Sequence, residues 1–313
     1  MIRKENMHLP VLFNEALHEL SIKPDGIYID CTFGRGGHSG GILQQLGSGG
    51  QLLALDRDLD AIKSEYAQEL DKDERFQLEH CCFSQLQEVV EKRGWQGKVD
   101  GILMDFGVSS PQLDNAQRGF SFMRDGPLDM RMDCTTGLSA AEWLASVTEE
   151  DLVQVLFDYG EERFARRIAN AVVTQRAEKP LVTTQQFVDL LVEAIPFKEK
   201  HKHPATRSFQ AVRIAVNREL EEITTVLDQA VNVLASGGIM AVISFHSLED
   251  RIAKRFIRDE SRGKYTSSKL PFQPEELAAI RLKKCGKAIK AGKQELAENP
   301  RSRSAVMRIA QRK

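Results

Sequence analysis

The chain has 313 residues and a net formal charge of −2, with 42% hydrophobic and 28% charged residues. This composition is ordinary for a soluble globular protein, and it excludes a fibrous chain and a chain that is disordered throughout. The first residues lack an apolar signal region, and no apolar run approaches the length that spans a bilayer, so we expect a cytoplasmic protein with no membrane partner.

The charge is distributed unevenly along the chain. Residues 251–313 hold 18 Lys and Arg against 6 Asp and Glu, a net charge of +12, which leaves −14 for residues 1–250. A basic segment on an acidic body indicates a polyanion partner, which in such a protein is most often nucleic acid. A solvated surface with no partner is the alternative.

The cysteines and histidines do not predict a metal site. The five cysteines are odd in number and show no Cys-x-x-Cys spacing, so neither a disulfide framework nor a structural zinc site is indicated. His201 and His203 lie close together, but no cysteine or third ligand is near them in the sequence. We therefore expect no metal.

The segment 26–56 predicts a β-α-β unit. Residues 26–30 form a short apolar strand that ends at Asp30, and the glycine-rich residues 31–41 turn sharply. Residues 42–46 predict a helix, and residues 51–56 a second buried strand that ends at Asp56.

This unit indicates a nucleoside-like ligand. Glycines at the first turn let the backbone approach a ligand, the helix N-terminus offers N–H donors, and Asp56 can accept both ribose hydroxyls. Ser39 stands where a dinucleotide fingerprint requires glycine, whereas Asp30 leads directly into the loop. An acid there suits a ligand with an ammonium and a sulfonium, which favours S-adenosylmethionine. A tight turn with no ligand is the alternative.

The sheet is expected to continue to Asp105. Residues 59–70 and 86–93 predict helices, and residues 75–83 and 99–105 predict strands. Because ligands lie beyond the carboxyl ends of parallel strands, Phe83 is placed to contact an adenine ring, although a core phenylalanine is the rival interpretation. Asp105 is the third acid at a strand end, and the loop after it is where reacting groups would lie.

A helical domain is expected between residues 115 and 217. Ser139 with Glu142 predicts a capping box and Thr148 with Asp151 a weaker one. The remaining helices are expected at 161–177, at 184–194 and from 204, with helical periodicity continuing to residue 234. Two basic groups could hold phosphates, although solvation is the plainer interpretation of any single charge: the loop 198–207, and Arg163, Arg166 and Arg167.

The chain then returns to the sheet. Residues 236–238 predict a turn and residues 239–244 a fifth buried strand, which leads to His246, Glu249 and Asp250. These three residues could form an acid/base cluster or a metal corner, but we favour the start of a helix for the two acids. Residues 304–310 predict a last strand after a basic, loop-rich segment 262–303.

Long motifs in this chain resemble the RsmH family, also called MraW. They cover residues 30–39, 105–113, 118–132 and 243–251, and shorter matches lie at 202–207 and 299–304. The resemblance covers essentially the whole chain. It implies methylation of the exocyclic N4 of a decoding-centre cytosine in 16S rRNA of the small ribosomal subunit, with S-adenosylmethionine as cofactor.

The resemblance also implies a fold and a site. The fold is α/β, a Rossmann-like methyltransferase sheet formed by residues 1–114 and 218–313, with an inserted all-helical substrate-recognition domain at 115–217. The family motifs assign Gly36, Gly37 and His38 to the amino-acid end of the cofactor, Asp56 to its ribose and Phe83 to its adenine, with Asp105 and Gln112 also lining the pocket.

Asp105 is the expected catalytic residue. The amine of cytosine is a poor nucleophile because its lone pair is delocalised, so transfer requires positioning and help in losing a proton. Asp105 and backbone carbonyls of the loop 106–110 could accept hydrogen bonds from the amine.

Two other functions remain as alternatives. One is a non-catalytic ribosome-assembly factor that only binds RNA, against which the intact Asp105 loop argues. The other is an NAD-dependent oxidoreductase, which Ser39 and the basic tail disfavour. The sequence leaves the oligomeric state open, a homodimer included.

Overall fold

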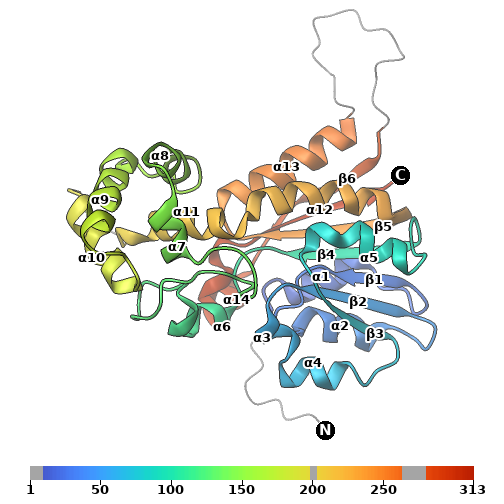
Figure 1. Ribbon diagram of the computed structural model, residues 1–313. Coiled ribbons are helices and arrows are strands. Elements are labelled where there is room, and N and C mark those ends of the chain that lie inside the picture. The colour runs from blue at the N-terminus through green and yellow to red at the C-terminus, as the bar shows by residue number, and fades with distance from the viewer. Residues whose placement is uncertain (1–9, 198–202, 263–279) are drawn as a thin grey trace, which may run out of the picture. The chain divides into compact units, whose positions relative to one another are not determined.

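The computed structural model describes residues 10–197, 203–262 and 280–313 (Figure 1). The chain divides into two compact units, the first formed by Met1–Gly107 and Leu220–Lys313 and the second by Val108–Glu219. The sequence placed the boundaries after residues 114 and 217, whereas the compact units divide after residues 107 and 219. In the described residues, no helix is both long and apolar enough to cross a bilayer.

The first unit is built on a sheet of seven strands within the described residues, in the order β3-β2-β1-β4-β5-β7-β6. The first five in this order pair in parallel, and β7 is antiparallel to both β5 and β6. The order 3-2-1-4-5 is that of a doubly wound sheet, which confirms the predicted Rossmann-like fold class. The strands are β1 (Ile27–Asp30), β2 (Gln51–Asp56), β3 (Phe76–His80), β4 (Val99–Asp105), β5 (Leu234–Ser244), β6 (Leu282–Lys290) and β7 (Val306–Arg312).

Helices cover both faces of this sheet, because its central strands are apolar on both sides. Along β1, Tyr28 is buried among residues of α1 and α2, whereas Ile29 is buried among residues of α5, α12 and α13. The helices of this unit are α1 (Phe13–Leu20), α2 (Gly37–Gln45), α3 (Leu59–Ile62), α4 (Glu65–Leu70), α5 (Leu86–Lys92), α12 (Glu219–Val233), α13 (Ser247–Arg262) and α14 (Lys293–Glu298). Most of α12 belongs to this unit, but its first residue belongs to the second.

Helix α2 begins at Gly37, so the predicted start at residue 42 was wrong. A Cβ at Gly41 would lie 2.6 Å from the ring of Phe13 on α1. Small residues in the first turns of α2 therefore allow close helix packing, and the sequence analysis had assigned them to the turn alone.

Two helical segments are interrupted where one helix was expected. The predicted helix 59–70 is split into α3 and α4, because the Ser64 side chain accepts the Ala67 N–H and starts a new helix. The periodicity from 204 onward is broken at Arg218, which has a left-handed backbone (φ +51°) between α11 (Ala205–Asn217) and α12.

The predicted turn at 236–238 lies inside β5 instead. Gly237 has φ +84°, and the pairing between β4 and β5 shifts register between Val99 and Gly101. The glycines therefore form an irregularity in the strand, which continues on both sides of them.

Strand β6 and helix α14 lie where a loop-rich segment was expected, so that prediction was wrong for residues 282–298. Within the described ranges, strand β6 pairs only with β7, at the edge of the sheet, and most of its side chains are exposed. Lysines are typical of an exposed edge strand. Because they replace apolar residues in β6, the sequence lacks the apolar alternation by which a strand is predicted.

The second unit is helical within its described residues. Its helices are α6 (Ser110–Asp114), α7 (Ala140–Ser146), α8 (Glu149–Asp158), α9 (Ala165–Glu178), α10 (Thr184–Ala194) and α11 (Ala205–Asn217), and they share one apolar core. Both predicted caps are confirmed, because Ser139 accepts the Glu142 N–H and Thr148 the Asp151 N–H. Helix α9 begins later than predicted, after Glu161 in a left-handed conformation (φ +50°).

Candidate cofactor and active site

Three carboxylates lie at the carboxyl ends of neighbouring parallel strands in the first unit. Asp30 ends β1, Asp56 ends β2 and Asp105 ends β4, with β1 paired between the other two strands. This edge is where ligands bind in open α/β sheets. The structure therefore brings together the three strand-end acids that the sequence singled out.

Asp30 organises the glycine turn. Its Oδ2 accepts a 2.7 Å hydrogen bond from the Ser39 hydroxyl, and its Oδ1 accepts one of 3.1 Å from the Thr32 N–H. The carboxylate is fully buried, and burial raises its pKa, although the hydrogen bonds from Ser39 and Thr32 partly oppose that shift. Both oxygens of Asp30 accept hydrogen bonds from this chain, one from the turn and one from α2, so its first role is to hold the turn.

Asp56 holds the same turn from the neighbouring strand. Its Oδ2 accepts the Gly34 N–H at 2.7 Å, and its Oδ1 accepts the Asp58 N–H at 2.8 Å. Burial raises its pKa to about 6, so the group is mainly ionised at neutral pH. Each oxygen retains a lone pair, and the carboxylate can accept further hydrogen bonds from a ribose.

Gly36 and Gly37 form the entry to α2. Gly36 is the N-cap with φ +76°, a conformation that favours glycine, and a Cβ there would lie 2.8 Å from the Phe33 ring. The first N–H groups of the helix have no partner within the helix and carry its positive dipole end. These features suit the carboxylate of a cofactor's amino-acid end.

His38 follows on α2 and is neutral at physiological pH. It is 4% exposed, and burial lowers its pKa to about 4. Its ring stacks on Phe13 with the centroids 6.0 Å apart, and its Nδ1 lies 3.7 Å from Oδ2 of Asp105. Its Nε2 is buried and has no hydrogen-bond partner among the described residues.

Asp105 is fixed through its backbone, with one carboxylate oxygen left without a partner. Its N–H donates a 2.8 Å hydrogen bond to Thr32 Oγ1, while its Oδ1 is buried and accepts no hydrogen bond from the part of the chain that the structure describes. Burial, followed by the charges of Asp30 and Glu249, raises its pKa well above the ordinary value. The side chain as a whole remains 21% exposed, so a ligand can reach it.

Nε2 of His38 and Oδ1 of Asp105 are both buried here without a hydrogen-bond partner among the described residues, and a polar ligand would satisfy them. A ligand with an ammonium group and a carboxylate fits the donors at the helix N-terminus and the acids at the strand ends. S-adenosylmethionine has both groups, together with ribose hydroxyls for Asp56.

Phe83 lies beyond the end of β3, in a short 3-10 helix. Its ring packs on Phe106 with centroids 5.7 Å apart, and it remains partly exposed beside the core cluster. One face of the ring thus contributes to packing. Contact with adenine stays a prediction.

Gln112 belongs to the second unit, as part of α6. It is 5% exposed, and its side-chain oxygen accepts the Ser109 N–H at 2.9 Å in a capping box. The sequence placed this residue in a loop and did not predict the helix. Its assignment to the cofactor pocket also stays a prediction.

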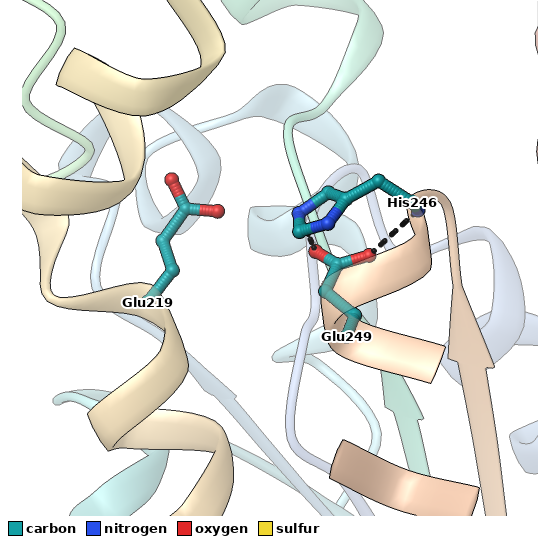
Figure 2. Close-up of side chains that lie close together, drawn as sticks. All are labelled: Glu219, His246 and Glu249. Carbon is teal, nitrogen blue, oxygen red and sulfur yellow. Dashed lines mark hydrogen bonds and ion pairs between the residues drawn. The ribbon is translucent and has the colours of Figure 1, made fainter. Parts of the chain in front are cut away.

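His246 and Glu249 meet at the start of α13 (Figure 2). The Glu249 carboxylate is fully buried, and its Oε2 accepts the N–H groups of Phe245 and His246 at 2.7 and 3.2 Å. These bonds confirm the helix-start interpretation for Glu249. The other oxygen, Oε1, lies 3.0 Å from His246 Nε2. Figure 2 also draws Glu219 of the second unit, whose carboxylate is bound by Arg213 at 2.8 and 2.9 Å.

Asp250 does not join that pair. Its two carboxylate oxygens accept hydrogen bonds from Arg308, Oδ1 from Nε at 2.6 Å and Oδ2 from Nη2 at 2.9 Å. Of the two histidines near residue 200, His201 lies outside the described residues, and His203 stacks on Phe122 with centroids 4.9 Å apart.

Sequence reasoning missed the roles of Thr32 and Ser39. Thr32 joins the ends of β1 and β4, because its backbone N–H binds Asp30 and its hydroxyl accepts the Asp105 N–H. Ser39 had been used only to argue against a dinucleotide. For Thr32 the available signal was its position two residues after a strand-end acid, an interval at which local hydrogen bonds are common.

Comparisons with known proteins give consistent results. The sequence profile of the MraW methylase family matches residues 5–313. A protein from Thioalkalivibrio sulfidiphilus, "Ribosomal RNA small subunit methyltransferase H", is 56% identical over 97% of this chain and 97% of its own length. A protein of the same name from Methylococcus capsulatus is 58% identical over 96% of this chain and 99% of its own length.

Similarity to solved structures is more distant. The crystal structure of a methyltransferase from Streptococcus mutans, in complex with SAH, has a TM-score of 0.41 at 10% sequence identity. The match covers 96% of this chain and 97% of that chain.

Proposed function

Because the chain belongs to the MraW methylase family, we propose that it methylates the exocyclic N4 of a decoding-centre cytosine in 16S rRNA of the small ribosomal subunit. Membership of this family makes the chain a methyltransferase and agrees with the expected cofactor, S-adenosylmethionine. The names of the relatives support ribosomal RNA as the substrate. The choice of N4 of cytosine rests on the resemblance of the motifs.

One observation carries the chemical part of the proposal. The carboxylate of Asp105 has a buried oxygen without a partner at the ligand edge of the sheet, and its backbone is fixed by Thr32. An acceptor held in this way needs no reorganisation before it binds an amine. Its raised pKa also makes it a stronger proton acceptor than a carboxylate in water.

When bound, S-adenosylmethionine supplies an electrophilic methyl group on a positively charged sulfur. In the transfer, a bond forms between N4 and the methyl carbon, the bond from that carbon to sulfur breaks, and N4 loses one proton. Asp105 accepts a hydrogen bond from the amine, which turns the nitrogen lone pair toward the methyl group, and then takes the proton.

The chain's other residues position the cofactor in this proposal. Gly36, Gly37 and His38 hold its amino-acid end, Asp56 its ribose and Phe83 its adenine, with Gln112 as a further contact. Because His38 is neutral, it does not repel the positively charged sulfur, and it forms no ion pair with Asp105 that would compete with the attraction between sulfur and this carboxylate. Phe83 adds a flat apolar surface that excludes water from one side of the base.

Transfer of labelled methyl from S-adenosylmethionine to small subunits from cells lacking this protein tests the proposal. Nucleoside analysis of the RNA should place the label in N4-methylated cytidine. Label in another nucleoside would overturn the choice of base. Binding of S-adenosylmethionine without any transfer would favour an RNA-binding assembly factor, and a melting shift with NAD alone would favour an oxidoreductase.

A further inference from the structure

A second feature of the first unit lies between α13 and the β6–β7 edge of the sheet. A cavity of about 380 Å³ is present there, and none of the described residues that line it bears a carboxylate. Its apolar floor includes Ile257 and Ile309, both buried. Of the residues that the structure describes, eight cationic ones line it: Arg251, Lys254, Arg255, Arg258, Arg262, Lys284, Lys287 and Arg308.

One wall of this basic groove is a stripe along α13. The lining cations at positions 251, 255, 258 and 262 are spaced by four, three and four residues, so they lie on one face of the helix. The buried residues of α13 include Ala253 and Ile257, and Ile257 lies next to the stripe because it also lines the groove. The stripe extends for about 16 Å, because each helical residue rises about 1.5 Å.

The other wall comes from an irregular part of β6. Cys285 pairs with Ile309 and Ile289 with Met307, so three residues of β6 stand opposite the single residue Arg308. Gly286 in this bulge has φ +59°. The bulge takes Lys287 out of the regular ladder, and both Lys287 and the preceding Lys284 are exposed residues of the groove.

Two of the lining cations, Arg308 and Arg258, are paired with neighbouring acids. Asp250 binds Arg308 at one end of α13, and Glu260 binds Arg281 at the other end, with N to O distances of 2.6 and 2.7 Å. By contrast, the ion pairs of this region among the described residues include none of Lys254, Arg255, Lys284 and Lys287. Asp259 pairs with Arg258 on the exposed side. The structure thus holds several positive charges close together without neutralising them.

We infer that this basic groove binds the phosphate backbone of an RNA strand. Like charges held together are unfavourable unless an anion binds them, and a row of cations over 16 Å matches consecutive phosphates better than one small anion. The apolar floor suits the sugar face of the strand. The inference rests on the proposed function for the identity of the polyanion, but the binding itself can be measured without methyl transfer.

Matched lysine variants test the groove. The variant K254Q/K284Q/K287Q removes three charges from it, and the control K72Q/K92Q/K98Q removes three exposed charges from residues that do not line it. Binding of a fluorescent single-stranded RNA is measured for both at several salt concentrations. Binding of S-adenosylmethionine and the melting temperature check that each variant is folded.

The groove variant should bind the RNA at least tenfold more weakly than the control variant. The slope of log K against log salt should fall in magnitude by about 2, since each lost phosphate contact on a single strand contributes about 0.7. Equal affinity and equal slope for the two variants would overturn the inference. So would groove-dependent binding to anionic lipid vesicles with no groove-dependent binding to RNA.

The two proposals fail in different ways. If the groove variant loses RNA binding while the wild-type protein transfers no methyl to small subunits, the groove stands and the proposed reaction fails. If the wild-type protein methylates the RNA and the groove variant keeps full RNA affinity, the reaction stands and the groove inference fails.

Discussion

The Ser39 hydroxyl donates a 2.7 Å hydrogen bond to Oδ2 of Asp30, and both residues are fully buried. The bond connects the first turns of α2 to the end of β1. A glycine at position 39, as the dinucleotide fingerprint requires, would leave this carboxylate oxygen without its donor. The residue that distinguishes this loop from a dinucleotide-binding loop therefore also stabilises it.

Replacing Ser39 by alanine should lower the free energy of unfolding by about 1.5–3 kcal/mol, the range for a hydrogen bond to a charged group. Chemical denaturation of the wild type and the variant measures the difference. Ser48 is exposed, and Ser48→Ala serves as the control with no expected change. Equal stability of the two variants would show that the bond contributes nothing net.

Asp105→Asn should reduce turnover by about 100-fold or more, because the amide is a much weaker proton acceptor than the carboxylate. The affinity for S-adenosylmethionine should change far less, since the amide oxygen can still accept a hydrogen bond. Single-turnover methyl transfer and calorimetric titration of the cofactor separate the two effects. Losses of equal size in turnover and affinity would contradict the catalytic role, and Asp71→Asn on the exposed surface should leave both unchanged.

Cofactor affinity should fall as the pH is lowered through about 6. Burial raises the pKa of Asp56 to about 6, so the carboxylate, which we propose accepts the ribose hydroxyls, becomes protonated below that pH. If binding requires the ionised form, affinity decreases by up to about tenfold per pH unit below the pKa. His38, with a pKa of about 4, stays neutral over most of this range. Titrations from pH 8 to pH 5 check the effect, which Asp56→Asn should weaken; an unchanged slope in that variant would assign it to another group.

Gly41→Ala should destabilise the protein by about 1–3 kcal/mol through overpacking against Phe13 and Leu17. The gain in helix propensity, about 0.5–1 kcal/mol, offsets only part of this cost. Gly292→Ala is the matched control, because a Cβ there meets nothing within 4 Å and the backbone is not left-handed. Thermal melting of the two variants compares them, and a Gly41→Ala protein as stable as the control would show that α1 can move away.

The sequence predicted the part of the fold in which hydrophobic pattern and strand ends coincide. The ends of β1, β2 and β4 at Asp30, Asp56 and Asp105 follow from short apolar runs closed by an acid. The same patterning misses β6, because an exposed edge strand with many lysines has no buried face to mark it. Periodicity also continued across Arg218, where a single left-handed residue separates two helices.

The site was less predictable than the sheet, because its geometry depends on hydrogen bonds. The positions of Asp56 and Asp105 followed from the β-α-β pattern, but the engagement of Asp30 by Ser39 and Thr32 did not. The spacing between residues 30 and 39 predicts a hydrogen bond only if α2 is known to start at Gly37. A pattern of residue types contains no information on which oxygen a hydroxyl reaches.

Thr32 is hydrogen-bonded to both Asp30 and Asp105, so these two acids are held in fixed positions at the same edge of the sheet. Their negative charges together act on any ligand bound there. A methyl donor carries a positive charge on sulfur, but the product left after transfer is neutral there. Carboxylates at this edge should therefore attract the donor more strongly than the product. The reaction itself would then weaken the hold on the spent cofactor, so that exchange for a new molecule is favoured by electrostatics and needs no separate opening movement.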